Sequence, residues 1–324
     1  MSHAIQVHRP GGPEELRWEE VEVGEPGPGL VRIRQTAVGL NFIDVYHRTG
    51  LYPQPYPFIP GVEGAAIVET LGPGVEGLTI GDRVAYAGPI GGYSQVRLIA
   101  ADRLIKLPDD ISDEQAAAMM LQGMTADMLI RSVRPLKAGE TILIHAAAGG
   151  VGLILCQWAA ALGATVIGTV SSEEKAALAA EHGCHHPIIY TRQDFAAEVD
   201  RLTGGEKLPV VYDSVGRDTF LRSLDCLQKR GLLVMFGQSS GPVDSFPPSL
   251  LAQKGSLFLT RPTLFDYVAR REELEASSAS LFDAVRSGKI KVDIGQQFPL
   301  SQAEVAHRAL ESRQTTGSTI LAVD

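Results

Sequence analysis

The central part of the chain alternates short apolar runs with longer segments of helical composition. Strands that alternate with helices are typical of a parallel sheet covered by helices on both faces. The pattern therefore predicts an α/β fold with a doubly wound sheet. The apolar runs predict strands over 141–145, 165–169, 186–190, 210–212, 232–236 and 256–260.

The first part of the chain has a different pattern, with short β patterns and few helices. Within residues 30–38, apolar Val31 and Ile33 alternate with Arg32 and Arg34, which is typical of a half-buried strand. This part is therefore expected to be an irregular β-rich domain. Turns rich in glycine and proline interrupt it at 26–29, 60–61 and 72–74.

The length of 324 residues suggests two domains. We expect a β-rich domain over 1–122 that is completed by 262–324, and an α/β domain over 123–261. A charged helix around 270–287 and short strands after it are expected to return to the first domain. The cleft between two such domains is the default position for an active site.

Composition is that of an ordinary globular protein, with 44% hydrophobic and 21% charged residues. The net charge of −9 argues against nucleic acid as the main partner, because phosphate binding needs a basic surface. No apolar run has membrane-spanning length and the N-terminus has no apolar signal core, so a cytoplasmic protein is expected. The scattered Cys156, Cys184 and Cys226 fit reduced thiols in that compartment.

The most informative segment is 141–168, which is an apolar strand, a glycine-rich turn, an apolar helix and a second apolar strand. Gly149 lets the backbone approach a pyrophosphate, and Gly152 lets the helix pack close to the strand, whereas Ala147 takes the place of a first glycine. The helix over 151–162 directs its free N–H groups at that pyrophosphate. The residues expected to contact it are Gly149, Gly150, Val151 and Gly152.

The end of the second strand indicates which dinucleotide binds. It lacks the acidic residue that usually binds the ribose hydroxyls of NAD. Ser171 is expected to form a capping box with Glu174, can donate a hydrogen bond, and is followed by Lys175. We therefore predict NADP, although Lys175 is equally consistent with an exposed helix lysine. Further cationic candidates are Arg192 and Arg313.

Short motifs spread over essentially the whole chain point to one family; they lie at 39–44, 48–53, 60–64, 81–84, 145–152, 212–216 and 260–262. Together they resemble the medium-chain dehydrogenase/reductase superfamily and, within it, the zinc-free NADPH:quinone oxidoreductases related to zeta-crystallin, above all the bacterial ones. The resemblance implies a Rossmann domain and a GroES-like β-rich domain.

The resemblance also indicates that no metal is needed. Zinc alcohol dehydrogenases of this superfamily place a cysteine ligand where Asn41 stands and a histidine ligand where Val62 stands, and no cysteine precedes Cys156. A quinone accepts hydride without the Lewis acid that alcohol oxidation needs. The histidine and cysteine cluster at 182–186 has donors for zinc, but an ordinary helix-to-strand turn is the preferred interpretation.

By resemblance, hydride passes from C4 of NADPH to a quinone held beside Asn41, which could donate to a developing oxyanion. Tyr46 and Tyr52 could flank the flat acceptor and either could supply a proton, as water could too. Arg261 resembles an arginine near the acceptor pocket. For Asn41 a turn residue, and for the tyrosines simple packing, are the alternatives, and His145 is expected to be structural.

The resemblance assigns the remaining residues to the cofactor. Phe42, Ile43, Asp44 and Tyr46 would line the nicotinamide side, and Thr125, expected to begin a helix, would contact the ribose. Residues expected at the 2′-phosphate end are Ser171, Lys175, Tyr190 and Arg313. Residues expected at the carboxyl ends of later strands, where ligands of such sheets bind, are Ser214, Phe236 and Gly237.

Two other functions remain open at this point. An enone or alkenal reductase would use the same cofactor and nearly the same cleft. A non-catalytic NADPH-binding protein, crystallin-like or RNA-binding, is the alternative of another class, and the acidic net charge weighs against RNA. The resemblance also implies a homodimer formed through the apolar edge strand 256–260.

Overall fold

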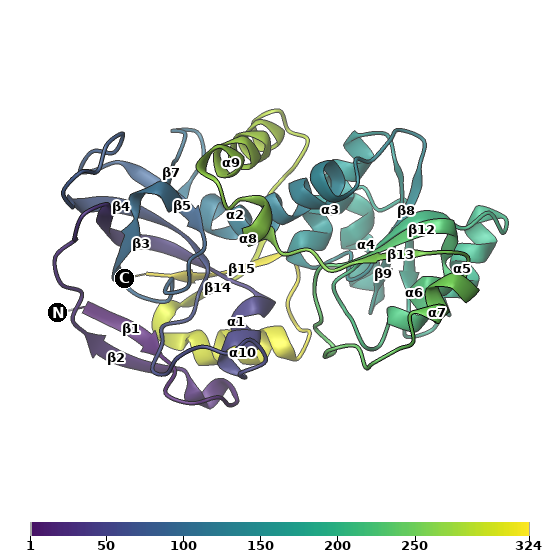
Figure 1. Cartoon of the computed structure of the whole chain (residues 1–324), viewed down its shortest axis with the longest axis horizontal. Helices are drawn as coiled ribbons and strands as arrows, with labels where there is room; N and C mark the ends of the chain where they lie inside the picture. Colours follow the sequence, from purple (N-terminus) through teal and green to yellow (C-terminus); the bar gives the residue numbers. More distant parts are fainter. Residues whose placement is uncertain (1, 324) are drawn as a thin grey trace. The chain divides into compact units, whose positions relative to one another are not determined.

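The computed structural model describes residues 2–323 and forms two compact units. Unit 1 contains 1–124, 268–281 and 292–324, and unit 2 contains 125–267 and 282–291. Figure 1 shows the elements of both units along the chain. Within residues 2–323, no helix is both long enough and apolar enough to cross a membrane.

Unit 2 is built on a parallel six-stranded sheet in the order β10-β9-β8-β11-β12-β13. The order reverses at β8, which has β9 on one side and β11 on the other, as in a Rossmann sheet. The predicted strands and the doubly wound fold are thus confirmed. The strands are β8 (Thr141–Ile144), β9 (Thr165–Val170), β10 (His186–Ile189), β11 (Leu208–Asp213), β12 (Leu227–Met235) and β13 (Phe258–Thr260).

The helices of unit 2 connect these strands, and the last of them follows β13. They are α3 (Gly150–Ala161), α4 (Glu173–Glu181), α5 (Phe195–Thr203), α6 (Phe220–Asp225), α7 (Ser249–Gln253) and α8 (Leu264–Tyr267). A π-helical segment, Met128–Val133, precedes β8.

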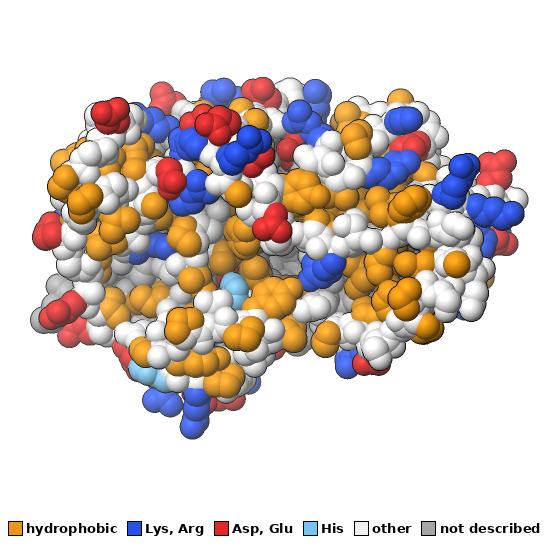
Figure 2. Space-filling view, in the orientation of Figure 1, with side chains coloured by type: hydrophobic (Ala, Val, Ile, Leu, Met, Phe, Trp, Pro, Cys, Tyr) orange, Lys and Arg blue, Asp and Glu red, His pale blue; other side chains and the backbone are white. Residues whose placement is uncertain are grey.

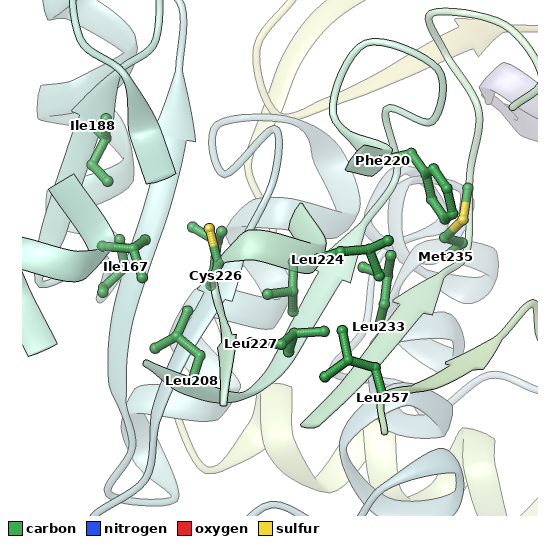
Figure 3. Packing of buried hydrophobic residues seen from close by; sticks show 13 residues of the cluster. Ile167, Ile188, Leu208, Phe220, Leu224, Cys226, Leu227, Leu233, Met235 and Leu257 are labelled. Carbon is green, nitrogen blue, oxygen red and sulfur yellow. The ribbon is translucent and has the colours of Figure 1, made fainter. Parts of the chain in front are cut away.

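An apolar core lies between one face of this sheet and its helices (Figure 3). Leu143, Ile167 and Leu233 come from strands, whereas Phe220 and Leu224 come from α6, and all are buried. Because this core holds β8, β9 and β12 in place, it fixes the strand ends where the polar residues of the site begin.

Unit 1 contains a mixed sheet in the order β14-β15-β3-β4-β5-β7, with β6 also paired to β3 and with β1 and β2 in a separate pair. In β3, buried Val31 and Ile33 alternate with exposed Arg34, as predicted. The strands are β1 (Ser2–Gln6), β2 (Arg17–Val21), β3 (Leu30–Leu40), β4 (Glu63–Leu71), β5 (Arg83–Ala87), β6 (Val96–Ala100), β7 (Ile105–Lys106), β14 (Ile294–Pro299) and β15 (Ser318–Ala322).

Four α-helices contribute to unit 1: α1 (Phe42–Arg48), α2 (Asp113–Asp127), α9 (Arg271–Arg286) and α10 (Ala303–Glu311). The charged helix expected around 270–287 is α9, and strands β14 and β15 follow it into the sheet of unit 1. Ala117 and Ala118 of α2 pack against Ala37 of β3 and Ile320 of β15. This contact packs α2 on β3, which Asn41 follows.

Candidate active site

The glycine-rich turn links β8 to α3 in unit 2. Ala146 has a left-handed conformation with φ 54°, and the N–H of Gly149 donates to the Ala146 carbonyl at 3.0 Å. A Cβ on Gly152 would lie 2.3 Å from that same carbonyl oxygen and 2.8 Å from the Ala147 carbonyl carbon. Because both neighbours are backbone atoms, position 152 requires glycine. The packing role predicted for Gly152 is confirmed.

The start of α3 is suited to an anion. Gly149 is its N-cap and, among the described residues, no side chain caps the helix. No acidic residue occurs in its first turn. The first-turn N–H groups and the helix dipole can therefore act on a pyrophosphate, and a Cβ on Gly149 would meet only the Ala146 oxygen at 3.3 Å. The turn thus fits a dinucleotide.

A buried network of hydrogen bonds supports this turn. His145 Nδ1 lies 2.9 Å from Thr169 Oγ1, and His145 Nε2 lies 2.9 Å from Ser223 Oγ. Ser223 donates to Asp213 Oδ2 at 3.2 Å, so its oxygen accepts from Nε2–H and Nδ1 accepts from Thr169. Burial lowers the pKa of His145, which is neutral. His145 is structural, as expected from its apolar strand.

The Asp213 carboxylate also orders the loop after β11. Its Oδ1 accepts from the N–H groups of Val215 and Gly216 at 2.8 and 3.0 Å, and its Oδ2 accepts from Thr219 at 2.7 Å. Ser214 lies within this loop. Asp213 belongs to the motif at 212–216, but its role was missed, because its partners come together only in the folded sheet.

The residues at the other carboxyl ends of this sheet lie close to that loop. The Phe236 N–H donates to the Asp213 carbonyl at 2.9 Å, and a Cβ on Gly237 would lie 2.6 Å from the Ser214 carbonyl oxygen. Arg261 follows β13 and donates to the Met235 carbonyl at 3.2 Å. The structure therefore brings Ser214, Phe236, Gly237 and Arg261 to one edge of the sheet.

Of the four residues predicted at the 2′-phosphate end, Ser171 and Lys175 follow β9 and Tyr190 follows β10, whereas Arg313 lies in unit 1. The Tyr190 N–H donates to the Val170 carbonyl at 3.1 Å. The expected capping box is wrong in one position: Ser172, not Ser171, is the N-cap of α4, and its Oγ accepts from the Lys175 N–H at 3.3 Å. The side chain of Ser172, rather than that of Ser171, faces the first turn of α4.

Three further candidates differ in position. Thr125 lies in the last turn of α2 rather than at a helix start, because α2 continues without a break from Asp113 to Asp127. Exposed Arg192 forms an ion pair with Glu173 at 2.8 Å. Arg313 follows α10 in unit 1, where its backbone is left-handed with φ 60°.

Asn41 stands in unit 1, between the end of β3 and the start of α1. Its backbone N–H donates to Asp44 Oδ2 at 2.9 Å, which fixes the first turn of α1. Its side chain is held on both sides: Nδ2 donates to Glu63 Oε1 at 2.5 Å, and Oδ1 accepts from Gln122 Nε2 at 3.1 Å. Neither Glu63 nor Gln122 was identified from the sequence, since β4 and α2 reach Asn41 only in the fold.

Two buried carboxyl groups flank Asn41. Burial raises the pKa of Glu63 to about 8, against the opposing effect of its hydrogen bonds from Asn41 and the Leu121 N–H. Burial likewise raises the pKa of Asp44 to about 7, although Tyr93 donates to it at 3.0 Å. The surroundings of Asn41 can therefore exchange protons near neutral pH.

Aromatic side chains cover the adjoining helix. The ring of Tyr46 lies 6.3 Å from Phe42 and 5.2 Å from Tyr52, the latter edge to face. Tyr46 is buried, whereas Phe42, Ile43 and Tyr52 are partly accessible. The structure thus brings Asn41, Phe42, Asp44, Tyr46 and Tyr52 together, which is consistent with a site for a flat ring.

Comparison with known proteins gives the chain its family. Residues 27–109 match the alcohol dehydrogenase GroES-like domain, and residues 150–276 match the zinc-binding dehydrogenase model. The chain is 52% identical over 323 residues to a quinone oxidoreductase of Pseudomonas aeruginosa, with 99% of each covered. It belongs to the quinone oxidoreductase family of the medium-chain dehydrogenase/reductase superfamily.

Two further relatives are similar to this chain over their full length. The structure of Escherichia coli quinone oxidoreductase complexed with NADPH is 49% identical, superimposes with a TM-score of 0.97, and covers 99% of both chains. A 2-haloacrylate reductase of a Burkholderia species is also 49% identical over 330 residues, again with 99% of both covered. The likeness extends over both units of this chain.

The zinc that the name of the second family model implies does not fit these residues. Within 2–323, no group of three histidine, cysteine or acidic side chains could hold a metal ion. Asn41 offers an amide already bonded to Glu63 and Gln122, and Val62 is buried and apolar. In the cluster at 182–186, His182 Nδ1 bonds to the Leu178 carbonyl. The side chains at these positions therefore do not form a zinc site in this member of the family.

Proposed function

We propose that this protein is an enzyme that uses NADPH to reduce quinones by direct hydride transfer. The observation that carries the proposal is the start of α3, which has no side-chain cap among the described residues and follows a turn that requires glycine at position 152. The chain is also about 50% identical to quinone oxidoreductases over its full length. NADPH supplies the hydride from C4 of its nicotinamide.

The cofactor contacts follow from unit 2. The backbone of Gly149, Gly150, Val151 and Gly152 binds the pyrophosphate, because these N–H groups have no side-chain cap among the described residues. Ser171, Lys175 and Tyr190, which follow β9 and β10 in sequence, are the proposed contacts of the 2′-phosphate, and Arg313 is the further cation proposed for it. Ser214, Phe236, Gly237 and Thr125 complete the cofactor contacts.

Unit 1 contributes the acceptor side. Tyr46 and Tyr52, whose rings pack edge to face at 5.2 Å, form one aromatic side of the proposed acceptor site. Phe42, Ile43 and Asp44 line the nicotinamide side, and Arg261, which belongs to unit 2, is the further residue proposed to contact the acceptor. Asn41 holds the carbonyl oxygen of the acceptor through its amide, whose orientation is fixed by Glu63 and Gln122.

Steady-state assays test the reaction. We expect rapid loss of NADPH absorbance with 1,4-benzoquinone and much slower loss with a linear enone. The chain is 49% identical to a protein named 2-haloacrylate reductase, so 2-chloroacrylate belongs in the same assay. A higher kcat/KM for 2-chloroacrylate than for any quinone would contradict the proposed substrate class.

Fluorescence titration with NADPH and NADH tests the cofactor. We expect a strong preference for NADPH that shrinks in Lys175→Ala, because the ammonium group no longer meets the 2′-phosphate. Lys289→Ala, which removes an exposed lysine elsewhere in unit 2, is the matched control and should keep the preference. Equal affinity for both nucleotides in the wild type would overturn the cofactor assignment.

We also propose a homodimer through β13. This strand is an edge of its sheet, Phe258 is 60% exposed, and Figure 2 shows hydrophobic side chains gathered on the surface over α6, α7 and β13. Phe258→Asp should give a monomer in sedimentation velocity, whereas Ile80→Asp, at a similarly exposed apolar position in unit 1, should not. A monomeric wild type at micromolar concentration would refute the dimer.

A cytoplasmic location completes the proposal. Cys156, Cys184 and Cys226 are all buried free thiols, as expected in a reducing compartment. Cell fractionation tests this location, and recovery of the protein from an oxidising compartment would contradict it.

A further inference from the structure

Four buried side chains form a row of hydrogen bonds that links β15 to β4 through Asn41. Ser318 Oγ lies 2.6 Å from Gln122 Oε1, Gln122 Nε2 lies 3.1 Å from Asn41 Oδ1, and Asn41 Nδ2 lies 2.5 Å from Glu63 Oε1. All four residues are at most 9% exposed. All four side chains belong to unit 1, so the geometry of this row is set within one compact unit.

With Glu63 ionised, each residue in this row donates its hydrogen bond to the next residue on the side of Glu63. The Ser318 hydroxyl donates to Gln122, the Gln122 amide donates to Asn41, and the Asn41 amide donates to the carboxylate. The Leu121 N–H donates to the other carboxylate oxygen at 2.7 Å. An ionised carboxylate only accepts, so this direction satisfies all of its contacts.

With Glu63 protonated, the same contacts work in the opposite direction. Glu63 Oε1–H would donate to an Asn41 oxygen, Asn41 to a Gln122 oxygen, and Gln122 to Ser318. The Ser318 hydroxyl would then donate to the Ala118 carbonyl, which already lies 2.8 Å away. A half-turn of each amide exchanges its oxygen and nitrogen at nearly the same positions. A single serine proton cannot serve Gln122 and Ala118 together, so each direction uses one of these two contacts.

Resting on the proposed function, we propose that Glu63 is a positioning residue that sets the direction of the Asn41 side-chain amide, and that proton uptake by Glu63 reverses this direction. The reversal exchanges a donor for an acceptor on each side of the Asn41 amide. Asn41 therefore presents a different hydrogen-bonding atom to the quinone and to the nicotinamide when Glu63 is ionised and when it is protonated.

The surroundings of Glu63 keep this proton exchange near neutral pH. The titratable groups that act on it from neighbouring elements are Asp44 of α1, Tyr86 of β5 and Tyr93. Ionised Asp44 opposes a second charge at Glu63. Gly39 of β3 packs so closely that a Cβ there would lie 2.3 Å from Glu63 Oε1, so this side chain has no room to turn away from Asn41.

The substitution Glu63→Gln traps one direction. The Leu121 N–H comes from the backbone of α2 and requires an acceptor, so the oxygen of the new amide must face it. The amide nitrogen then faces Asn41 and donates to its oxygen. The variant therefore has the arrangement of protonated Glu63 at every pH. Glu69→Gln, on the same strand but paired with Arg34 at the surface, is the matched control.

Nuclear magnetic resonance of ¹⁵N-labelled protein tests the reversal without any substrate. The Asn41 side-chain amide pair is identified as the pair that is lost in Asn41→Asp. We expect it to shift with a midpoint near the pKa of Glu63, about 8, in the wild type and in Glu69→Gln. In Glu63→Gln it should stay at the low-pH position. A wild-type pair that does not move from about pH 6 to about pH 10 would refute the proposal, even if the variant does not fold.

The pH profile of quinone reduction tests the consequence for turnover. The wild type and Glu69→Gln should show a step in kcat/KM with the same midpoint as the amide shift. Glu63→Gln should show no step at the midpoint of the amide shift and should keep, above that midpoint, the value that the wild type has just below it. A variant that keeps the step, or that matches the high-pH value, would overturn the positioning role. An absence of turnover with any quinone would count against the proposed function instead, and the amide titration would still decide the role of Glu63.

Discussion

The two units bury polar groups at the ends of their strands in different ways. In unit 2, Asp213 accepts hydrogen bonds from two backbone N–H groups and from the hydroxyls of Thr219 and Ser223. In unit 1, Glu63 accepts only two, and Asp44 keeps a buried oxygen that has no partner among the described residues. Asp213 thus has four donors among the described residues, whereas Glu63 has two and one oxygen of Asp44 has none.

This difference decides which unit responds to pH. A carboxylate with a full set of donors is stabilised as the charged form, whereas a buried carboxyl with few donors retains its proton to higher pH. Burial raises the pKa of Asp44 to about 7 and that of Glu63 to about 8. The hydrogen bonds of Asp213 therefore support the glycine turn of unit 2, whereas the buried Glu63 and Asp44 of unit 1 exchange protons near neutral pH.

The largest effect is expected when the support in unit 2 is removed. Asp213→Ala leaves its buried donors without an acceptor, which should lower the free energy of unfolding of unit 2 by about 4 kcal/mol. Trp158 of α3 reports on unit 2, provided that Trp18 of unit 1 is replaced by phenylalanine in all proteins compared. Urea titrations followed by this fluorescence measure the change. A loss below about 1 kcal/mol would mean that the network is not a support.

The second effect separates packing from binding within the glycine turn. Gly152→Ala should cost about 3 kcal/mol, because its Cβ would meet the Ala146 and Ala147 backbone at 2.3 and 2.8 Å. Gly149→Ala should cost much less, because its single contact is at 3.3 Å, yet it should weaken NADPH binding. The same urea titration and a fluorescence titration with NADPH compare the two. Equal stability losses would contradict the distinction.

The sequence reveals unit 2 more fully than unit 1. The strands, the turn and the role of Gly152 follow from local apolar periodicity and from the steric need for glycine, which the sequence carries in one continuous segment. Glu63 and Gln122 do not follow, since β4 and α2 meet Asn41 only through the pairing of β3 with β4 and the packing of α2 on β3. Ser171 was assigned one residue too early as a cap because both Ser171 and Ser172 precede the acidic first turn of α4.

The third effect concerns the pH dependence of unit 1. Glu63 and Asp44 have folded pKa values above their ordinary 4.5 and 3.8, so the folded state binds more protons than the unfolded state over this interval. Their contribution to stability is fully present below the ordinary values and is lost as pH rises through about 7 and about 8. From pH 5 to pH 9, unit 1 should lose several kcal/mol of its free energy of unfolding, with most of the loss complete by about pH 8.

Glu63→Gln tests this expectation further. The variant should lose less free energy of unfolding in unit 1 as the pH rises, and above the pKa of Glu63 its unit 1 should be more stable than that of the wild type. Fluorescence of Trp18, in proteins with Trp158→Phe, measures unit 1 at each pH. Asp213→Asn in unit 2 provides the contrast and should leave this pH dependence of unit 1 unchanged. A wild-type unit 1 that gains stability from pH 5 to pH 9 would contradict the expected sign of the pH dependence.

The smallest effect tests how the neutral ring of His145 is held. Thr169→Val replaces the hydroxyl that donates to His145 Nδ1 by a methyl group of similar size, so only one acceptor loses its partner. The loss should be about 1 kcal/mol, well below that of Asp213→Ala, because the Nε2–H bond to Ser223 remains. Thr165→Val, at the start of the same strand, is the control. Because burial lowers the pKa of His145 and the ring is neutral in both proteins, the loss should be the same at pH 7 and pH 9. A loss that changed between these values would place a titrating group in the unit 2 network and would remove the contrast with unit 1.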